Sequence, residues 1–287
     1  MTKRTVLFGA ALLTLMAFGW WFFAIPDVSD VAIPQADESI ERGHYLVDAA
    51  GCVSCHEGIE HPGTLSGGLA LTTEFGTFFV SNITPDETTG IGGWNGRDFL
   101  LALKHGRSRE GDYYFPVFPY RAYAGMTDED VLDVAAYLMS LPSVKSAVPD
   151  HETSFWLQRW MIAGWNRLAS ALQPDFSVES DPKIERGSYL ARSLGHCGEC
   201  HTPRNIFGIP DLRREFAGAR LGEGDVEAID EQALSQWTQE DFVYLLFLGV
   251  KPDGEFVGGE MEKVIEHNTG RLTQEDREAL AAFFKRD

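Results

Sequence analysis

The chain has 287 residues and a formal net charge of −19, because 43 aspartates and glutamates outnumber 24 lysines and arginines. This length suits two domains of ordinary size. So acidic a surface argues against binding to nucleic acid or to anionic lipid. It could steer a basic partner such as a soluble cytochrome, or it could serve solubility alone.

The first residues predict a membrane anchor. An apolar run over 5–24 follows Lys3 and Arg4 and contains no charged residue. Twenty helical residues are about 30 Å long, which is enough to cross the hydrocarbon layer. The two basic residues would hold the N-terminus in the cytoplasm. We therefore expect a single-pass helix in the bacterial cytoplasmic (inner) membrane, with the rest of the chain in the periplasm. The alternative is a long, cleaved signal peptide.

Every cysteine of the chain lies in one of two Cys-x-x-Cys-His strings, at 52–56 and 197–201. This pattern is typical of c-type haem attachment, in which the histidine binds the iron. We therefore predict two covalently bound haems, held by Cys52, Cys55, Cys197 and Cys200, with His56 and His201 as iron ligands. One structural zinc, disulfides or a thioredoxin-like pair are the alternatives, and none of them explains the histidine after both pairs.

The rest of the chain contains an internal repeat. The sequence Glu-Arg-Gly at 41–43 recurs at 185–187, and the two haem strings follow in the same order. A segment led by tryptophan and a Thr-x-x-Asp segment come next in both halves, at Trp94, Trp237, Thr127 and Thr273. Each unit is therefore predicted to contain a helix, a haem string, a loop, a Trp-led helix, a loop and a closing helix.

The closing helices and the first helices carry further signals. Thr127 and Thr273 are predicted N-caps, since an aspartate follows three residues later as in a capping box. In the first unit, apolar residues then share one helical face and Pro142 marks the stop. Gly43 and Gly187 recur at the same place in the first helices. We expect them where the first helix approaches the closing helix closely.

A linker rich in aromatic residues joins the two units. Its stretch 155–165 has a helical pattern and contains three tryptophans. These side chains could pack on the two units, on a partner subunit or on a membrane surface. We take packing on the two units as the default.

Methionines are the candidates for the sixth iron ligand, because six-coordinate electron carriers often pair histidine with methionine. Met261 is one predicted ligand, since it lies in a loop before the closing helix and could reach the far haem face. Met126 is the predicted ligand of the first iron, although it directly precedes a helix cap and the repeat makes Phe115 the equivalent of Met261. Met139, His105 and an open position are the alternatives for the first iron.

Three further side chains are candidates for hydrogen bonds to haem propionates. They are Asn82, Trp94 and Arg204. Each could equally have a structural role. Together with the haem-string residues they complete the predicted cofactor-binding set.

Four short strings carry a resemblance to a known family. They are Asn-Ile-Thr-Pro-Asp at 82–86, Thr-Gly-Ile-Gly-Gly-Trp at 89–94, Phe-Pro-Tyr at 118–120 and Cys-His-Thr-Pro-Arg-Asn at 200–205. With these strings the chain resembles the multi-haem cytochrome c subunits of membrane-bound periplasmic dehydrogenases that act on alcohols, gluconate or aldehydes. Many such subunits carry three haems, and many have Met-Pro-Tyr in place of Phe-Pro-Tyr. The second difference removes one ligand candidate and favours Met126.

The resemblance implies an all-α fold of two tandem class I cytochrome c domains, here with an N-terminal transmembrane helix. We expect five segments along the chain. They are an anchor over 1–26, a linker over 27–37, the first domain over 38–145, a linker with the aromatic-rich helix over 146–181 and the second domain over 182–287.

We therefore expect a membrane-anchored periplasmic dihaem c-type cytochrome that is not itself an enzyme. It would relay single electrons from a dehydrogenase catalytic subunit or a quinol-oxidising partner to quinone, a soluble cytochrome or a terminal oxidase. The alternative is a peroxidase-like dihaem redox enzyme with an open or displaceable ligand position at the first haem. A thiosulfate-oxidising enzyme would need a further cysteine ligand, and the haem strings use all four.

Overall fold

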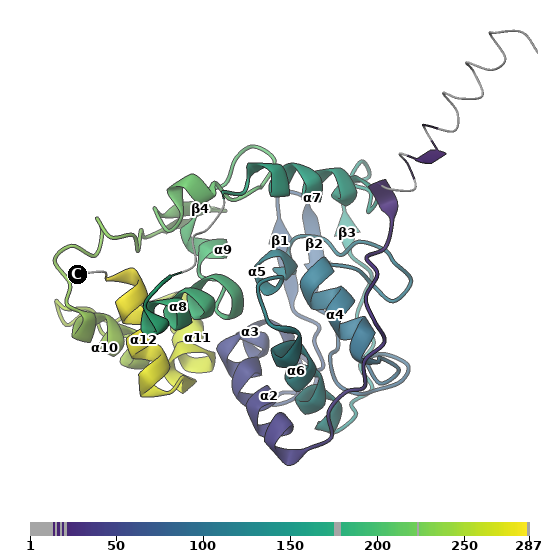
Figure 1. The fold of residues 1–287 in the computed structure, drawn as a ribbon, viewed down its shortest axis with the longest axis horizontal. Helices are drawn as coiled ribbons and strands as arrows, with labels where there is room; N and C mark the ends of the chain where they lie inside the picture. Colours follow the sequence, from purple (N-terminus) through teal and green to yellow (C-terminus); the bar gives the residue numbers. More distant parts are fainter. Residues whose placement is uncertain are drawn as a thin grey trace, which may run out of the picture.

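The computed structural model describes residues 14, 16, 17, 19, 22–174, 179–222 and 224–285. Its helices form two units that lie beside one another, with α7 (Met161–Leu172) along the top of the view in Figure 1. The helices of the first unit are α2 (Asp37–Ala49), α3 (Cys52–His56), α4 (Gly96–His105), α5 (Tyr120–Tyr123) and α6 (Asp128–Ser140).

The second unit has a similar order of elements. Its α-helices are α8 (Pro182–Tyr189), α9 (Gly198–His201), α10 (Gln239–Leu248), α11 (Glu260–His267) and α12 (Gln274–Phe284). A π-helical turn, η1 (Leu190–Leu194), continues α8, and the 3₁₀ turns η2 (Leu212–Arg214) and η3 (Thr269–Arg271) lie in the connections.

The first and last helices of each unit pack against one another at a glycine. A Cβ atom on Gly43 of α2 would lie 1.9 Å from the backbone oxygen of Asp133 in α6. One on Gly187 of α8 would lie 2.0 Å from the backbone oxygen of Ala279 in α12. No side chain fits at such distances. The prediction that these two glycines mark a close helix approach is confirmed.

Local capping signals fix the ends of the other long helices. Asn95 begins α4 and Thr238 begins α10, each with a capping box closed by the aspartate three residues later. Both helices end at a glycine in the left-handed conformation, Gly106 (φ 61°) and Gly249 (φ 72°). Equivalent signals thus give equivalent helices in the two units.

The closing helices begin at the predicted caps. The Thr127 side chain accepts from the backbone N–H of Asp130 (3.1 Å), and the Thr273 side chain accepts from that of Asp276 (3.2 Å). Both N-cap predictions are therefore confirmed.

The chain is not all-α, and this part of the predicted fold is wrong. The strands are β1 (Ala70–Thr73), β2 (Gly76–Phe79), β3 (Glu152–Thr153), β4 (Ala219–Leu221) and β5 (Gly224–Val226). β1 and β2 pair antiparallel with Ala70 opposite Phe79, and β3 of the linker adds to the other side of β2. β4 and β5 form a second antiparallel hairpin. Strands this short do not show the period-two alternation by which sequence identifies a strand.

The predicted N-terminal transmembrane helix needs a second correction. No helix among the described residues is both long enough and apolar enough to cross a membrane. The prediction of a single-pass protein of the cytoplasmic membrane is therefore wrong for this part of the chain, and most of the predicted span 5–24 lies outside the described residues. From Ala24 to Ala36 the chain has no regular secondary structure, whereas a membrane span needs about 20 continuous helical residues.

The linker helix α7 docks on both units. Its Asn166 accepts a hydrogen bond from the Tyr120 hydroxyl in α5 (2.9 Å), and its Trp165 donates one to the carbonyl of Phe207 in the second unit (2.8 Å). Packing of the linker on the two units is therefore confirmed for Trp165. The other two tryptophans of the linker remain largely exposed.

The largest hydrophobic core is shared by the two units. Val47 and Val131 of the first unit belong to the same cluster of buried side chains as Leu190 and Leu280 of the second. Burial of this joint apolar surface stabilises both units together. The boundary between the units is thus part of the core.

Candidate haem-attachment sites

Each haem string follows a residue in the left-handed conformation. Gly51 (φ 64°) lies directly before the first string, and His196 (φ 39°) lies directly before the second. Such a residue turns the chain sharply between the preceding helix and the string. Glycine adopts this conformation freely, whereas histidine does so uncommonly. The contacts of the His196 ring must therefore hold it in place.

The cysteines of each string lie about one helical turn apart and so on the same side of the chain. Cys52 and Cys197 are half-buried, Cys55 and Cys200 are exposed, and all four are free thiols. Burial raises the pKa of both Cys52 and Cys197 to about 12, so these two thiols are protonated at neutral pH. The same pattern in both units fits attachment of each string along one edge of a haem.

The alternative of a zinc site finds no support. Within 22–174, 179–222 and 224–285, no three His, Cys, Asp or Glu side chains converge so that they could hold a metal ion. A structural zinc needs four ligands around one point. The two Cys-x-x-Cys pairs therefore do not form a shared metal site.

A backbone carbonyl orients the histidine of each string. His56 Nδ1 donates to the carbonyl of Ser81 (2.8 Å), and His201 Nδ1 donates to the carbonyl of Glu227 (2.7 Å). Because a carbonyl can only accept, Nδ1 carries the proton, and Nε2 is the nitrogen that can bind iron. Burial lowers the pKa of both rings and favours the neutral form that a metal requires. These residues fit one histidine-ligated haem iron in each unit.

The two hairpins place these carbonyl acceptors. Ser81 lies two residues after β2, and Glu227 directly follows β5. The acceptors lie 25 and 26 residues after their histidines. The sequence alone does not single them out, because every residue has a backbone carbonyl. Their matching distance from the two haem strings is the signal that could have identified them.

The two predicted methionine ligands have different surroundings. Met126 is 3% exposed and belongs to the core cluster against which Cys52 packs. Met261 is half-buried and is the second residue of α11, whereas the sequence predicts a loop there. Helix α11 contacts α3, which carries the first haem string. Both ligand roles stay predictions.

The remaining candidates for the first iron can also be located. Phe115, the predicted equivalent of Met261, packs against Phe78 of β2 with ring centroids 5.2 Å apart, in a small core of its own. The first unit therefore uses this position for packing. Met139 packs half-buried against the main core, and His105 is exposed at the end of α4.

The three propionate candidates have contacts within the protein. The Asn82 amide donates to the carbonyl of Val144 (2.8 Å), and Arg204 donates to the carbonyl of Glu199 (2.9 Å). Trp94 packs half-buried against the main core. Each thus has a structural role, and propionate binding stays a prediction.

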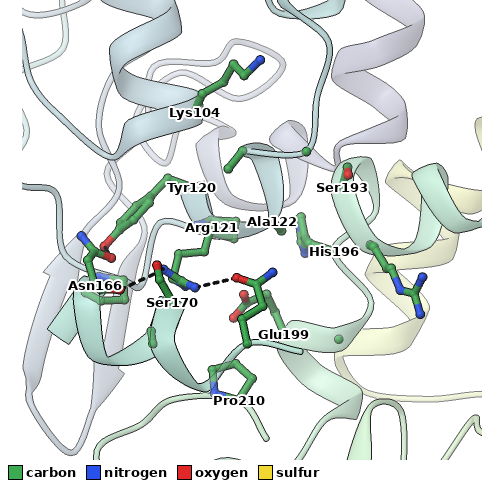
Figure 2. A pocket seen from close by; sticks show the side chains of 18 of the residues that line it. Lys104, Tyr120, Arg121, Ala122, Asn166, Ser170, Ser193, His196, Glu199 and Pro210 are labelled. Atoms are coloured by element: carbon green, nitrogen blue, oxygen red, sulfur yellow. Dashed lines mark hydrogen bonds between the residues drawn. The ribbon is translucent and has the colours of Figure 1, made fainter. Parts of the chain in front are cut away.

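A cavity of about 950 Å³ lies where α5, α7 and the second haem string meet. Figure 2 shows Tyr120 and Asn166 in one part of its wall and His196 and Glu199 in another. Arg121 extends between α5 and α7 and donates to Gln173 (3.0 Å). The first unit, the linker helix and the second haem string therefore share one polar wall.

Comparison with known proteins agrees with this geometry. A family model described as cytochrome c matches residues 40–142. The chain is 40% identical to a "Diheme cytochrome c-type" protein of Cereibacter sphaeroides, over 99% of this chain and 98% of that protein. It is 34% identical to the gluconate 2-dehydrogenase cytochrome c subunit of Pantoea cypripedii, over 89% of this chain and 61% of that subunit.

A third relative is the cytochrome c subunit of a quinone alcohol dehydrogenase of Gluconacetobacter polyoxogenes. It is 32% identical to this chain, over 88% of this chain and 57% of that subunit. The chain therefore spans less than two thirds of the two dehydrogenase subunits but nearly all of the Cereibacter protein. The resemblance inferred from the short strings is confirmed.

Proposed function

Because the chain belongs to the dihaem c-type cytochromes and is an electron-transfer protein rather than a catalytic subunit, we propose that it binds two haems covalently and relays single electrons from a dehydrogenase. The peroxidase-like alternative is not adopted, because the dehydrogenase relatives are cytochrome subunits.

One observation carries the proposal. In both units a histidine that directly follows a Cys-x-x-Cys pair is held by a backbone carbonyl through Nδ1, at 2.8 Å for His56 and at 2.7 Å for His201. This bond fixes the ring and presents Nε2, as a metal-ligating histidine requires. Its repetition at equivalent positions supports two haems of the same kind.

The chain's own side chains would complete each site. When bound, haem c supplies a one-electron couple whose potential depends on its axial ligands, its hydrogen bonds and its burial. Met126 is our proposed sixth ligand in the first unit and Met261 in the second. Different surroundings of these methionines, one in the core and one half-buried on α11, would give the two irons different potentials.

A dehydrogenase is the proposed electron donor. Two relatives are cytochrome subunits of a gluconate and of an alcohol dehydrogenase, so a catalytic subunit of that general class is the partner we infer. Quinone, a soluble cytochrome or a terminal oxidase is the proposed acceptor. The net charge of −19 favours a basic cytochrome among these, because opposite charges speed diffusional encounter.

The test is native purification of the tagged, haem-loaded chain. We expect a dehydrogenase catalytic subunit to co-purify at equal stoichiometry, and we expect its substrate to reduce the haems, as read from the visible absorption spectrum. A variant with Cys52→Ala and Cys55→Ala is the control, since it should still bind the partner but lose half of the absorbance change. Recovery with an oxidase alone, without reduction by any dehydrogenase substrate, would overturn the proposal.

A further inference from the structure

Each unit completes the start of the other unit's closing helix. The Tyr45 hydroxyl of α2 donates to Asp276 Oδ2 in α12 (2.5 Å) and accepts from the backbone N–H of Thr273 (3.3 Å). In an ordinary capping box that aspartate would bond the cap N–H directly. Here a tyrosine hydroxyl from the other unit lies between the two groups.

The same arrangement occurs in the opposite direction. The Tyr189 hydroxyl of α8 donates to Asp130 in α6 and accepts from the backbone N–H of Thr127 (3.4 Å). Tyr45 and Tyr189 are equivalent in the repeat, and so are the two aspartates. We call these two reciprocal contacts the tyrosine clasp. When equivalent residues of two units make the same hydrogen bonds in both directions, the interface has two-fold symmetry.

We call the boundary between the two units the seam. At this seam the residues that precede the first haem string lie near those that precede the second. Asn268 of the second unit donates to the carbonyl of Ala49 (3.0 Å), and the Tyr123 hydroxyl donates to the carbonyl of Ala50 (3.1 Å). Ala49 is the last residue of α2 and Ala50 is its C-cap, and only Gly51 separates them from the first string. The Tyr123 ring also packs edge-to-face on His196, directly before the second string, with centroids 5.5 Å apart.

Two more contacts place the strings themselves close to this seam. Helix α11 of the second unit contacts α3, and Figure 1 shows both helices where the two units meet. A Cβ atom on Gly195, two residues before Cys197, would lie 4.0 Å from the carbonyl oxygen of Ala49. The chain segments that lead into the two strings are therefore about one methyl group apart at this point.

We propose that the tyrosine clasp holds the two haem strings at a fixed separation for direct electron exchange between the two haems. Tyr45 and Tyr189 are then positioning residues, since they act through the closing helices and not on the haems. In each exchange one ferrous iron becomes ferric and the other ferric iron becomes ferrous, and no bond forms or breaks. This inference rests on the proposed function in one respect, the presence of both haems.

The clasp can fix the position of one unit against the other, because its hydrogen bonds join helices of both units. Asp276 also takes part in an ion pair of its own unit, since Arg186 donates two hydrogen bonds to it (2.8 and 2.7 Å). The Asp276 carboxylate therefore joins α8, α12 and α2 of the other unit at one point. Loss of one hydroxyl leaves a cap N–H and a carboxylate oxygen without that partner, so the units can shift along the seam.

The test uses the full-length, haem-loaded chain with Tyr45→Phe, Tyr189→Phe and both together. The distance between the two ferric haems is read by pulsed electron paramagnetic resonance, and the rate of inter-haem exchange by flash photoreduction. We expect the double variant to broaden the distance distribution and to slow exchange several-fold, at unchanged haem content and absorption spectrum. Tyr244→Phe is the matched control, because this tyrosine is 52% exposed on α10 and outside the clasp.

A double variant with the native distance distribution and the native rate would overturn the clasp, and so would a native protein without inter-haem exchange. If a tyrosine variant lost a haem, Asp130→Ala with Asp276→Ala would remove both acceptors and make the same test with both rings in place. Failure of the dehydrogenase to reduce the native chain is a separate result, which refutes the proposed function and leaves these measurements unaffected.

Discussion

Substitution of Gly43 by alanine tests the packing that organises each unit. The new Cβ would lie 1.9 Å from the Asp133 oxygen, whereas ordinary contact begins near 3.4 Å, so α2 and α6 would have to part by about 1.5 Å. The blocking atom belongs to a helix backbone and cannot turn aside. Overpacking of this kind costs about 3 kcal/mol, and alanine recovers about 1 kcal/mol of helix propensity. The expected net loss is about 2 kcal/mol.

The measurements are urea unfolding and thermal unfolding of the haem-loaded protein, both followed by circular dichroism. A loss of this size should lower the melting temperature by about 5 °C in a chain of this length. Gly164→Ala is the matched control, because it lies inside α7 with no atom nearer than 3.9 Å to the new Cβ, and it should stabilise by up to about 1 kcal/mol. Equal stability of Gly43→Ala and the native protein would refute the reasoning.

Three further predictions concern the sites and the clasp. Met261→Leu and Met126→Leu should each convert one haem from low-spin to high-spin, as seen by electron paramagnetic resonance. If both haems of a variant stay low-spin, the substituted methionine is not an iron ligand. His56→Ala should abolish the low-spin signal of the first haem only, so a loss at both haems would contradict the independence of the two histidines. Burial favours a raised pKa for Asp276, but hydrogen bonds from Arg186 and a tyrosine hydroxyl outweigh it and lower this pKa. The ionised Asp276 therefore stabilises the fold above the unfolded pKa of about 3.9, and this stabilisation is lost as pH falls through the folded pKa. In Asp276→Asn the melting temperature should depend less on pH below about pH 4. The same dependence as in the native protein would contradict this role of Asp276.

Sequence predicted the parts of this protein that depend on local signals. The caps Thr127 and Thr273 and the glycines Gly43 and Gly187 occupy the predicted places, because a cap or a close helix approach demands a particular residue type. The haem strings are equally local, since their spacing within five residues defines the chemistry.

The parts that sequence did not predict depend on backbone atoms or on pairing between distant segments. The Ser81 carbonyl that orients His56 can come from any residue type, and the hairpin before it has strands too short to show a pattern. The role of Tyr45 depends on a partner 231 residues away in the sequence. The repeat was visible in the sequence, but it did not reveal how its two copies pack.

The two-fold character of the seam has a consequence for how the protein could have evolved. An interface of this kind, with Tyr45 and Tyr189 in matching roles, is what a pair of identical one-haem chains would have formed before their joining. In such a pair any mutation changes both halves at once. After fusion into one chain, a mutation changes only one half. Gene fusion would thus have kept the symmetric seam and freed the two redox centres to diverge.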